Sequence, residues 1–207
     1  MDTAAGLRER KKEETRIALS WAAIRLTVER GLDNVRVEDI AAEVGVSTRT
    51  FSNYFTNKAE AIAARHVDRA RAIVAELRSR PTDEPIWDAI TNAVLARFAL
   101  GKDLADQNTS YEQWHTGVRL MVAEPALQSE FLRAGMLLQT EFAAVIAERT
   151  GTDASKDLYP RLVAGAVDAA VNVSIQQWLA TDPPVPMGSL LRDAFGQLAA
   201  GLPVPTH

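Results

Sequence analysis

The sequence predicts an all-α protein with an amino-terminal helix-turn-helix head and a larger helical body, about nine helices in all. Its apolar residues recur three and four positions apart along most of the chain, as the buried face of a helix requires. No segment alternates apolar and polar residues in the way of a half-buried strand. Glycines and prolines stand between the periodic segments, where helices end. With 47% apolar residues among 207, the chain can bury one large core or two smaller ones.

The first predicted helix, over residues 13–30, follows a basic arm and ends at Gly31. Apolar residues repeat along it at intervals of four, three and four, which gives it one buried face. The arm has an alternative interpretation as an ordinary solvated run of charges. The basic residues of the arm are Arg8, Arg10, Lys11 and Lys12, and the apolar residues of the helix are Ile17, Trp21, Ile24 and Val28.

Two short helices joined at a glycine are predicted next. The first covers residues 37–44 and carries a single apolar stripe. Gly45 follows where the chain must turn sharply, and we expect it at positive φ, which costs glycine little. Ser47 is placed to cap the second helix by accepting a hydrogen bond from a backbone N–H. The residues of the apolar stripe are Val37, Ile40, Ala41 and Val44.

The second short helix has an outward face of polar side chains without an acid. At about 100° per residue, Phe51 and Phe55 share the inward face, whereas Arg49 and Asn53 lie almost opposite. Arginine can bond the edge of guanine, asparagine the edge of adenine, and hydroxyl groups either base edges or phosphates. The pattern therefore predicts a helix that reads double-stranded DNA, against the plainer alternative of an acid-poor helical corner.

Asp39-Ile40-Ala41, Gly45-Val46-Ser47, Thr50-Phe51, Tyr54-Phe55 and Lys58 together form one specific signature. Through this signature, over about residues 8–70, the chain resembles the helix-turn-helix region of the TetR family of bacterial transcriptional regulators. Two positions depart from the family pattern, since Ser52 stands where a tyrosine is common and Arg49 where a small residue or proline is common. The operator sequence of another member therefore cannot be transferred.

The resemblance implies DNA contacts from both short helices and from the start of the helix over residues 13–30. Arg36 stands where many members have a capping threonine, so we expect it to reach a phosphate and Asp33 or Asn34 to cap the helix. The predicted DNA-binding residues are Thr15, Arg16, Arg36, Ser47, Thr48, Arg49, Thr50, Ser52, Asn53, Tyr54 and Lys58.

A long helix over residues 58–80 is predicted to connect the DNA-binding domain, residues 1–57, to a ligand-binding and dimerisation domain, residues 81–207. Asn57 and Glu60 form a capping box at its start, and the Pro-Thr-Asp-Glu-Pro segment at residues 81–85 marks the boundary at its end. The further helices are predicted at residues 86–100, 102–108, 111–123, 125–150, 154–180 and 188–200.

Residues 154–200 are predicted to form a homodimer interface. Small residues between positions 164 and 170 allow helices to approach closely, and residues 188–200 carry an apolar stripe. The family resemblance places the last two long helices of each subunit in a four-helix interface, with burial inside a single chain as the alternative. Two heads about 34 to 36 Å apart would read a palindromic operator.

The resemblance also implies a ligand that changes the spacing of the two heads and releases the DNA, repression being the commoner mode of the family. We expect a hydrophobic or amphipathic small molecule, by analogy with members that bind fatty-acyl thioesters. Each candidate lining residue has an alternative interpretation as plain core. The candidates are Phe98, Trp114, Val118, Met121, Phe131, Met136, Phe142 and Trp178.

Other classes of protein are less well supported. The absence of cysteine excludes disulfides and thiolate chemistry, and no secretory signal or long apolar run appears, so we expect a cytoplasmic protein without a membrane span. Glu112 and His115 form one Glu-x-x-His pair, but a di-iron bundle needs two such pairs. We expect neither an enzyme nor a metal or cofactor. A constitutive helix-turn-helix or architectural protein without a ligand remains an alternative.

The net charge of −4 is unevenly distributed. Residues 1–80 hold 15 Lys and Arg against 12 Asp and Glu, whereas residues 81–207 hold 8 against 15. Affinity for DNA depends on the phosphates that are neutralised locally. An acidic body is therefore compatible with DNA binding by the amino-terminal part.

Overall fold

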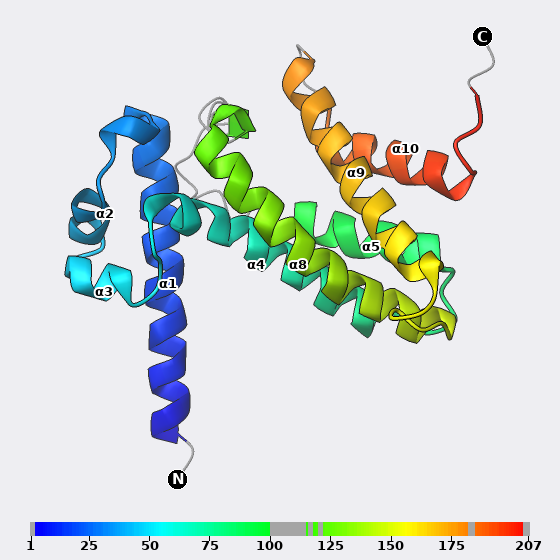
Figure 1. Cartoon of the computed structure of the whole chain (residues 1–207), viewed down its shortest axis with the longest axis horizontal. Helices are drawn as coiled ribbons and strands as arrows, with labels where there is room; N and C mark the ends of the chain where they lie inside the picture. The colour runs from blue at the N-terminus through cyan, green and yellow to red at the C-terminus, as the bar shows by residue number, and fades with distance from the viewer. Residues whose placement is uncertain (1–2, 100–114, 116–117, 120–121, 182–184, 205–207) are drawn as a thin grey trace. The chain divides into compact units, whose positions relative to one another are not determined.

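The computed structural model describes residues 3–99, 115, 118–119, 122–181 and 185–204, and every regular element within them is a helix (Figure 1). The prediction of an all-α fold is confirmed for these residues. The predicted helices at 102–108 and 111–123 lie almost wholly outside them. The elements are α1 (Thr3–Arg30), η1 (Leu32–Asn34), α2 (Val37–Glu43), α3 (Thr48–Ser52), α4 (Lys58–Ser79), α5 (Ile86–Ala99), α8 (Pro125–Thr150), α9 (Leu158–Ala180) and α10 (Met187–Ala199).

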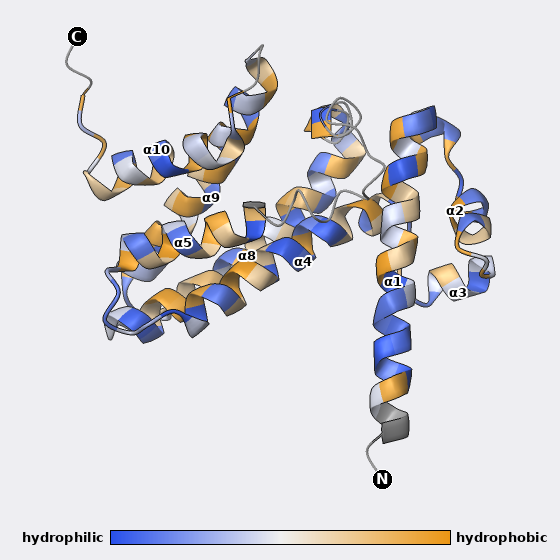
Figure 2. Ribbon diagram, turned by 180° about the vertical axis from the view of Figure 1, so that it is seen from behind, coloured by the Kyte–Doolittle hydropathy of each residue, from blue (hydrophilic) through white to orange (hydrophobic). Residues whose placement is uncertain are grey.

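Helix α1 is longer than the sequence pattern predicted. It begins at Thr3, so the basic residues expected in a separate arm lie on the helix itself. Arg10 pairs with Glu14 at 3.6 Å and Lys12 with Glu9 at 3.8 Å, and such pairs one turn apart stabilise an exposed helix. Figure 2 shows hydrophilic residues along the first half of α1. The apolar periodicity predicted only the half that is buried.

Helix α9 begins later than predicted, at Leu158, because the preceding residues form a compact turn. Within this turn the backbone N–H of Asp153 donates to the carboxylate of Asp157 at 2.7 Å. The backbone N–H of Ser155 donates in turn to the carboxylate of Asp153 at 2.8 Å. These side-chain acceptors hold the backbone outside the helix, as short acidic residues often do.

The described residues group into two compact units. The first unit consists of residues 1–68 and 110–134, and the second of residues 69–109 and 135–207. Helices α4 and α8 each contribute residues to both. No described helix combines the length and the apolar character needed to cross a membrane.

The core of the first unit is formed by α1, the two short helices, the start of α4 and the first turns of α8. Leu127 of α8 is fully buried in it. The sequence pattern assigned this residue to the second domain, because local periodicity does not show which core a helix joins. The largest fully buried side chains of the unit are Leu19, Leu26, Ile40, Phe51, Ile62 and Leu127.

The second unit is built from the remaining part of α4, with α5, α8, α9 and α10. Helix α10 packs on α9 and α5 through Leu191 and Phe195, which are buried. The apolar stripe that the sequence offered for dimerisation in this helix is therefore used inside the chain. The largest fully buried side chains of the unit are Leu77, Ile90, Ile146, Leu191 and Phe195.

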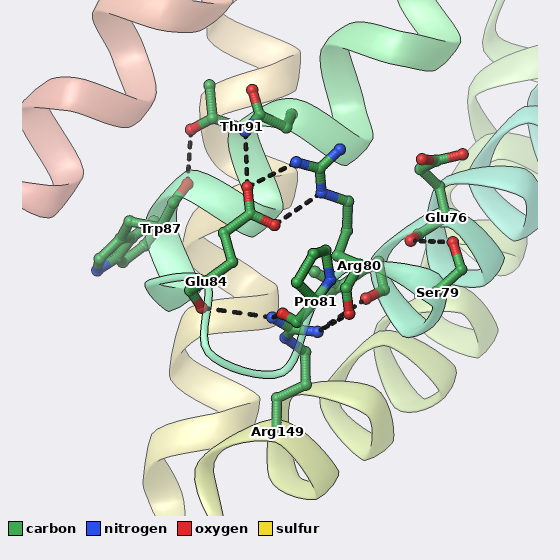
Figure 3. A network of polar contacts seen from close by, with 10 residues as sticks. Glu76, Ser79, Arg80, Pro81, Glu84, Trp87, Thr91 and Arg149 are labelled. Carbon is green, nitrogen blue, oxygen red and sulfur yellow. Dashed lines mark hydrogen bonds and ion pairs between the residues drawn. The ribbon is translucent and has the colours of Figure 1, made fainter.

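Arg149 near the end of α8 holds the loop between α4 and α5 (Figure 3). Its guanidinium donates to the carbonyl oxygens of Arg80 at 2.9 Å and Pro81 at 2.6 Å. Arg80 also donates two hydrogen bonds to the carboxylate of Glu84, each 2.7 Å long. One arginine thus satisfies carbonyls that the end of α4 leaves without a helical partner.

Candidate nucleic-acid interface

The turn between α2 and α3 has the geometry that its glycine predicts. Gly45 has a φ of 72°, which confirms the expected positive value. The N–H of Gly45 donates to the carbonyl of Ala42 at 3.0 Å, and the N–H of Val46 donates to the carbonyl of Ala41 at 2.9 Å. These two bonds form a Schellman motif, which ends α2 and directs the chain into α3.

Side chains cap the two short helices, but only one of them as predicted. Ser47 accepts a 3.1 Å hydrogen bond from the N–H of Thr50, which confirms its role at α3. At α2 the capping position is held by Arg36, whose backbone N–H donates to the carboxylate of Asp39 at 2.9 Å. The expectation that Asp33 or Asn34 caps α2 is wrong. The amide of Asn34 instead donates to the carbonyl of Arg30 at 2.8 Å, at the end of α1.

The inward side of α3 anchors the helix in the first unit. Phe51 is 1% exposed and Phe55 is 4% exposed, and their ring centroids lie 5.7 Å apart. Tyr54 is half-buried beside Phe55, at a centroid distance of 6.5 Å. Burying two phenylalanines fixes the orientation of a helix that is only five residues long.

The opposite side of α3 is exposed and polar. Thr48, Arg49, Ser52 and Asn53 are all exposed, and Thr50 lies at the margin. The hydroxyl of Ser52 donates to the carbonyl of Thr48 at 3.1 Å, which leaves its oxygen able to accept. No hydrogen bond or ion pair within the described residues engages the guanidinium of Arg49. The exposed set therefore offers donors and acceptors without a carboxylate.

Lys58, at the start of α4, is engaged within the first unit. Its ammonium donates to the carbonyl oxygens of Leu32 at 2.6 Å and Val35 at 2.9 Å. It thereby ties α4 to η1 and to the segment that leads into α2. An ammonium group has three donors, so one can still face a phosphate.

The two α1 residues of the predicted interface are also engaged. The hydroxyl of Thr15 donates to the carbonyl of Lys11 at 2.9 Å. Arg16 pairs with Glu13 at 2.9 Å and with Asp68 of α4 at 2.5 Å. The hydrogen bond that Arg16 donates to the carboxylate of Glu13 contributes most to raising the pKa of Arg16. Sequence reasoning missed Asp68, because no local pattern relates residues 52 positions apart.

The structure describes six of the eight predicted ligand-binding residues. Phe98 and Phe142 pack in the core of the second unit, whereas Phe131 packs in the core of the first, with its ring 5.2 Å from that of His66. Trp178 is buried and Met136 is 74% exposed. Val118 is half-buried, and Trp114 and Met121 lie outside the described residues.

The described residues show no group of three histidine or acidic side chains placed to hold a metal. His115 of the Glu-x-x-His pair is half-buried and takes part in an interaction, while Glu112 lies outside the described residues. This part of the structure therefore gives the metalloenzyme alternative no support.

The capped α2–α3 corner and its exposed polar helix define a helix-turn-helix DNA-binding protein. Two known protein families match this chain. The family described as "Bacterial regulatory proteins, tetR family" matches residues 21–64, and the family described as "MftR C-terminal domain" matches residues 84–203. The chain belongs to the TetR family of bacterial transcriptional regulators.

Individual relatives support this assignment. The HTH-type transcriptional regulator TcmR of Streptomyces glaucescens is 30% identical over 173 residues, which cover 84% of this chain and 76% of TcmR. A TetR-family regulator from Syntrophomonas wolfei has a similar fold, with a TM-score of 0.64 at 20% identity, covering 94% of this chain and 99% of its own. FadR of Thermus thermophilus, a repressor solved with lauroyl-CoA, has a TM-score of 0.54 at 17% identity, covering 93% and 97%.

Proposed function

We propose that this protein represses transcription by binding a palindromic operator as a homodimer, and that a hydrophobic or amphipathic small molecule releases it. The exposed face of α3 carries the proposal. It presents Arg49 and Asn53 outward on a helix fixed by two buried phenylalanines and a serine cap. A rigid helix with such side chains fits the major groove.

The other predicted residues contribute contacts of a different kind. Arg49 and Asn53 read base edges, whereas the hydroxyls of Thr48, Thr50 and Ser52 bond phosphates or bases. Because Lys58 and Arg16 hold the first unit together, their main contribution is to position α3 and α1. Contacts of Lys58 and Arg16 with phosphates come in addition to this positioning role.

The two-fold symmetry of a palindrome requires a dimer, and the second unit presents a surface for it. Helix α9 comes near α8 at one point, where a Cβ atom on Gly165 would meet the side chain of Gln139 at 3.7 Å. The α8 and α9 residues of this unit include large apolar side chains exposed by 43% to 74%. They are Met136, Leu137, Leu158, Tyr159, Leu162 and Val173.

Covering exposed apolar side chains of this kind with another protein surface lowers the free energy. We therefore assign the dimer contact to α8 and α9. Within residues 154–200, where the sequence predicts the dimer interface, we infer that α9 supplies the surface and that α10 packs behind it.

The proposed ligand rests on analogy and on the apolar character of the body. FadR of T. thermophilus, which shares the fold, was solved with lauroyl-CoA. A fatty-acyl thioester is accordingly the first compound class to test. Such a ligand acts as an inducer only if it binds more tightly to the state with low DNA affinity.

Selection of duplexes from a random DNA pool tests the proposed DNA binding directly. We expect a palindromic sequence to be enriched, and purified protein to bind it at least 1,000-fold more tightly than scrambled DNA, on the order of the usual specificity of such regulators. Equal binding to both duplexes would contradict the proposal.

Titration with acyl-CoA thioesters of increasing chain length tests the ligand. A true ligand raises the unfolding temperature by mass action and lowers operator affinity in the same concentration range. A rise in unfolding temperature without a change in operator affinity would favour a constitutive DNA-binding protein over a ligand-responsive one.

A further inference from the structure

Helix α9 carries opposite charges on the exposed side that the proposed dimer would cover. Arg161 and Asp168 are both exposed and lie seven residues apart. Seven residues make two helical turns, so the two side chains point in nearly the same direction, about 10.5 Å apart along the axis. Both stand on the flank of the stripe that contains Leu158, Leu162 and Val173.

Neither charge is used in a salt bridge within the described residues. The carboxylate of Asp168 accepts one long hydrogen bond, 3.3 Å, from the amide of Asn172. Neighbouring atoms partly shield Asp168 from water, and this desolvation raises its pKa. An ion partner from outside the chain would stabilise such a carboxylate.

The order of the charges selects one arrangement of two copies. If two α9 helices met in parallel about a two-fold axis, each residue would lie at the same height as its own counterpart, so Arg161 would not stand opposite Asp168 of the partner. In an antiparallel pair centred near Gly165, position 161 of each copy lies opposite position 168 of the other. A two-fold interface then forms the same pair twice.

The centre of this arrangement is built from small residues. Gly165 and Ala166 are half-buried, and Ala169 is exposed. Short side chains at a contact allow helix axes to approach to about 8 Å. The exposed side chains of Leu158 and Val173 lie toward the ends of the contact, and that of Leu162 lies beside its centre, where they can pack against the partner.

We propose that reciprocal ion pairs between Arg161 of one subunit and Asp168 of its partner set the antiparallel register of the α9 helices and restrict dimerisation to copies of this chain. The inference rests on the proposed homodimer and names the residues that specify it. The apolar face supplies most of the affinity, while the charges select the partner and the register.

Charge reversal tests this assignment. In Arg161→Glu both interface pairs become acid against acid, and in Asp168→Arg both become base against base. Each variant alone should dimerise on the order of tenfold more weakly than the unchanged protein. When the two variants are mixed, both pairs between unlike subunits are restored, so a heterodimer should form with nearly the original affinity.

Analytical ultracentrifugation of the full chain, with one variant fluorescently labelled, measures these affinities. Arg192→Glu is the matched control, since Arg192 is an exposed arginine of α10 outside the proposed face, and it should dimerise normally. Circular dichroism confirms that each variant is folded.

The outcomes separate the two proposals. A wild-type protein that stays monomeric at micromolar concentration would overturn the homodimer itself. A wild-type dimer with unaffected charge-reversal variants would overturn only the register. The register would also be overturned if both variants dimerised weakly and their mixture formed no heterodimer. That result would mean that the substitutions had damaged folding or packing, because only restored ion pairs can recover the affinity on mixing.

Discussion

At the residue scale, we propose that specificity for DNA depends on a few side chains that contribute nothing to the core. Arg49 and Asn53 are exposed, and the helix that carries them is fixed by Phe51 and Phe55 on its other side. Substitutions of Arg49 or Asn53 should therefore alter DNA recognition and leave folding intact. Substitutions of Phe51 or Phe55 should unfold the DNA-binding head.

We predict that Arg49→Ala and Asn53→Ala each reduce discrimination between the selected operator and scrambled DNA. Loss of a bidentate base contact costs about 1–3 kcal/mol of discrimination. Fluorescence anisotropy with both duplexes measures it, and Arg192→Ala, far along the chain on an exposed position of α10, serves as the control. An equal loss of affinity for both duplexes would show that the changed residue does not read bases.

Lys58 provides a contrasting case, since its ammonium is bonded to two carbonyls. We predict that Lys58→Met lowers the free energy of unfolding by about 2 kcal/mol, the usual scale for hydrogen bonds to a charged group. Urea denaturation followed by circular dichroism measures this loss. Unchanged stability together with uniformly weaker DNA binding would instead indicate a phosphate contact as the main role of Lys58.

At the scale of elements, the end of α4 illustrates how distant residues complete a helix. The loop that follows α4 is held by Arg149 of α8 and by the pair of Arg80 with Glu84. The hydrogen bond from Arg80 lowers the pKa of Glu84 to about 2, and Asn92 contributes a further bond. Protonation of Glu84 would weaken this loop.

The pKa of Glu84 predicts how the pH dependence of stability responds to Glu84→Gln. A carboxyl whose pKa is lower in the folded state stabilises the protein above its ordinary pKa of 4.5, and this stabilisation is lost as the pH falls toward about 2. The variant should therefore be less stable than the wild type near neutral pH, and the difference should shrink below about pH 4.5.

Urea titrations over a series of pH values provide the measurement for Glu84→Gln. Glu148→Gln is the control, because Glu148 pairs with Arg78 at 3.3 Å in a mostly exposed position. Such a pair should contribute little at any pH. A stability difference for Glu84→Gln that stays constant across the acid range would contradict the assigned role.

At the scale of the whole molecule, charge is separated along the chain, with a basic excess in residues 1–80 and an acidic excess in residues 81–207. The first half of α1 adds exposed basic residues to the unit that contains α3, and two of them, Arg10 and Lys12, pair with acids on the same helix. Affinity for DNA should therefore fall with salt in proportion to the phosphates contacted.

We predict that replacing Arg8 and Lys11 together by glutamine reduces the slope of log affinity against log salt by about 2, or about 1 for each lost phosphate contact. Sequence preference should not change. Binding titrations at several salt concentrations measure the slope, with Arg192→Gln as the control. An unchanged slope would indicate that Arg8 and Lys11 do not contact phosphates. It would support the alternative interpretation, in which the basic arm is a solvated run of charges.

The sequence alone determined the helical fold, the short helices of the head and the polar outward face of α3. These features depend on periodicity, on a glycine at a turn and on a capping serine, all of which act over a few residues. For the same reason the predicted start and end of α8 agree with the structure, at Pro125 and Thr150.

Tertiary structure alone decided which core each helix joins and which charged groups are engaged. The tie between Arg16 and Asp68, the carbonyls bonded by Lys58 and the burial of Leu127 with the head all connect residues distant in sequence. The same is true of α10, whose apolar stripe is covered within the chain, whereas one side of α9 keeps exposed apolar residues. An apolar stripe shows that a helix must be covered, but only packing shows by what.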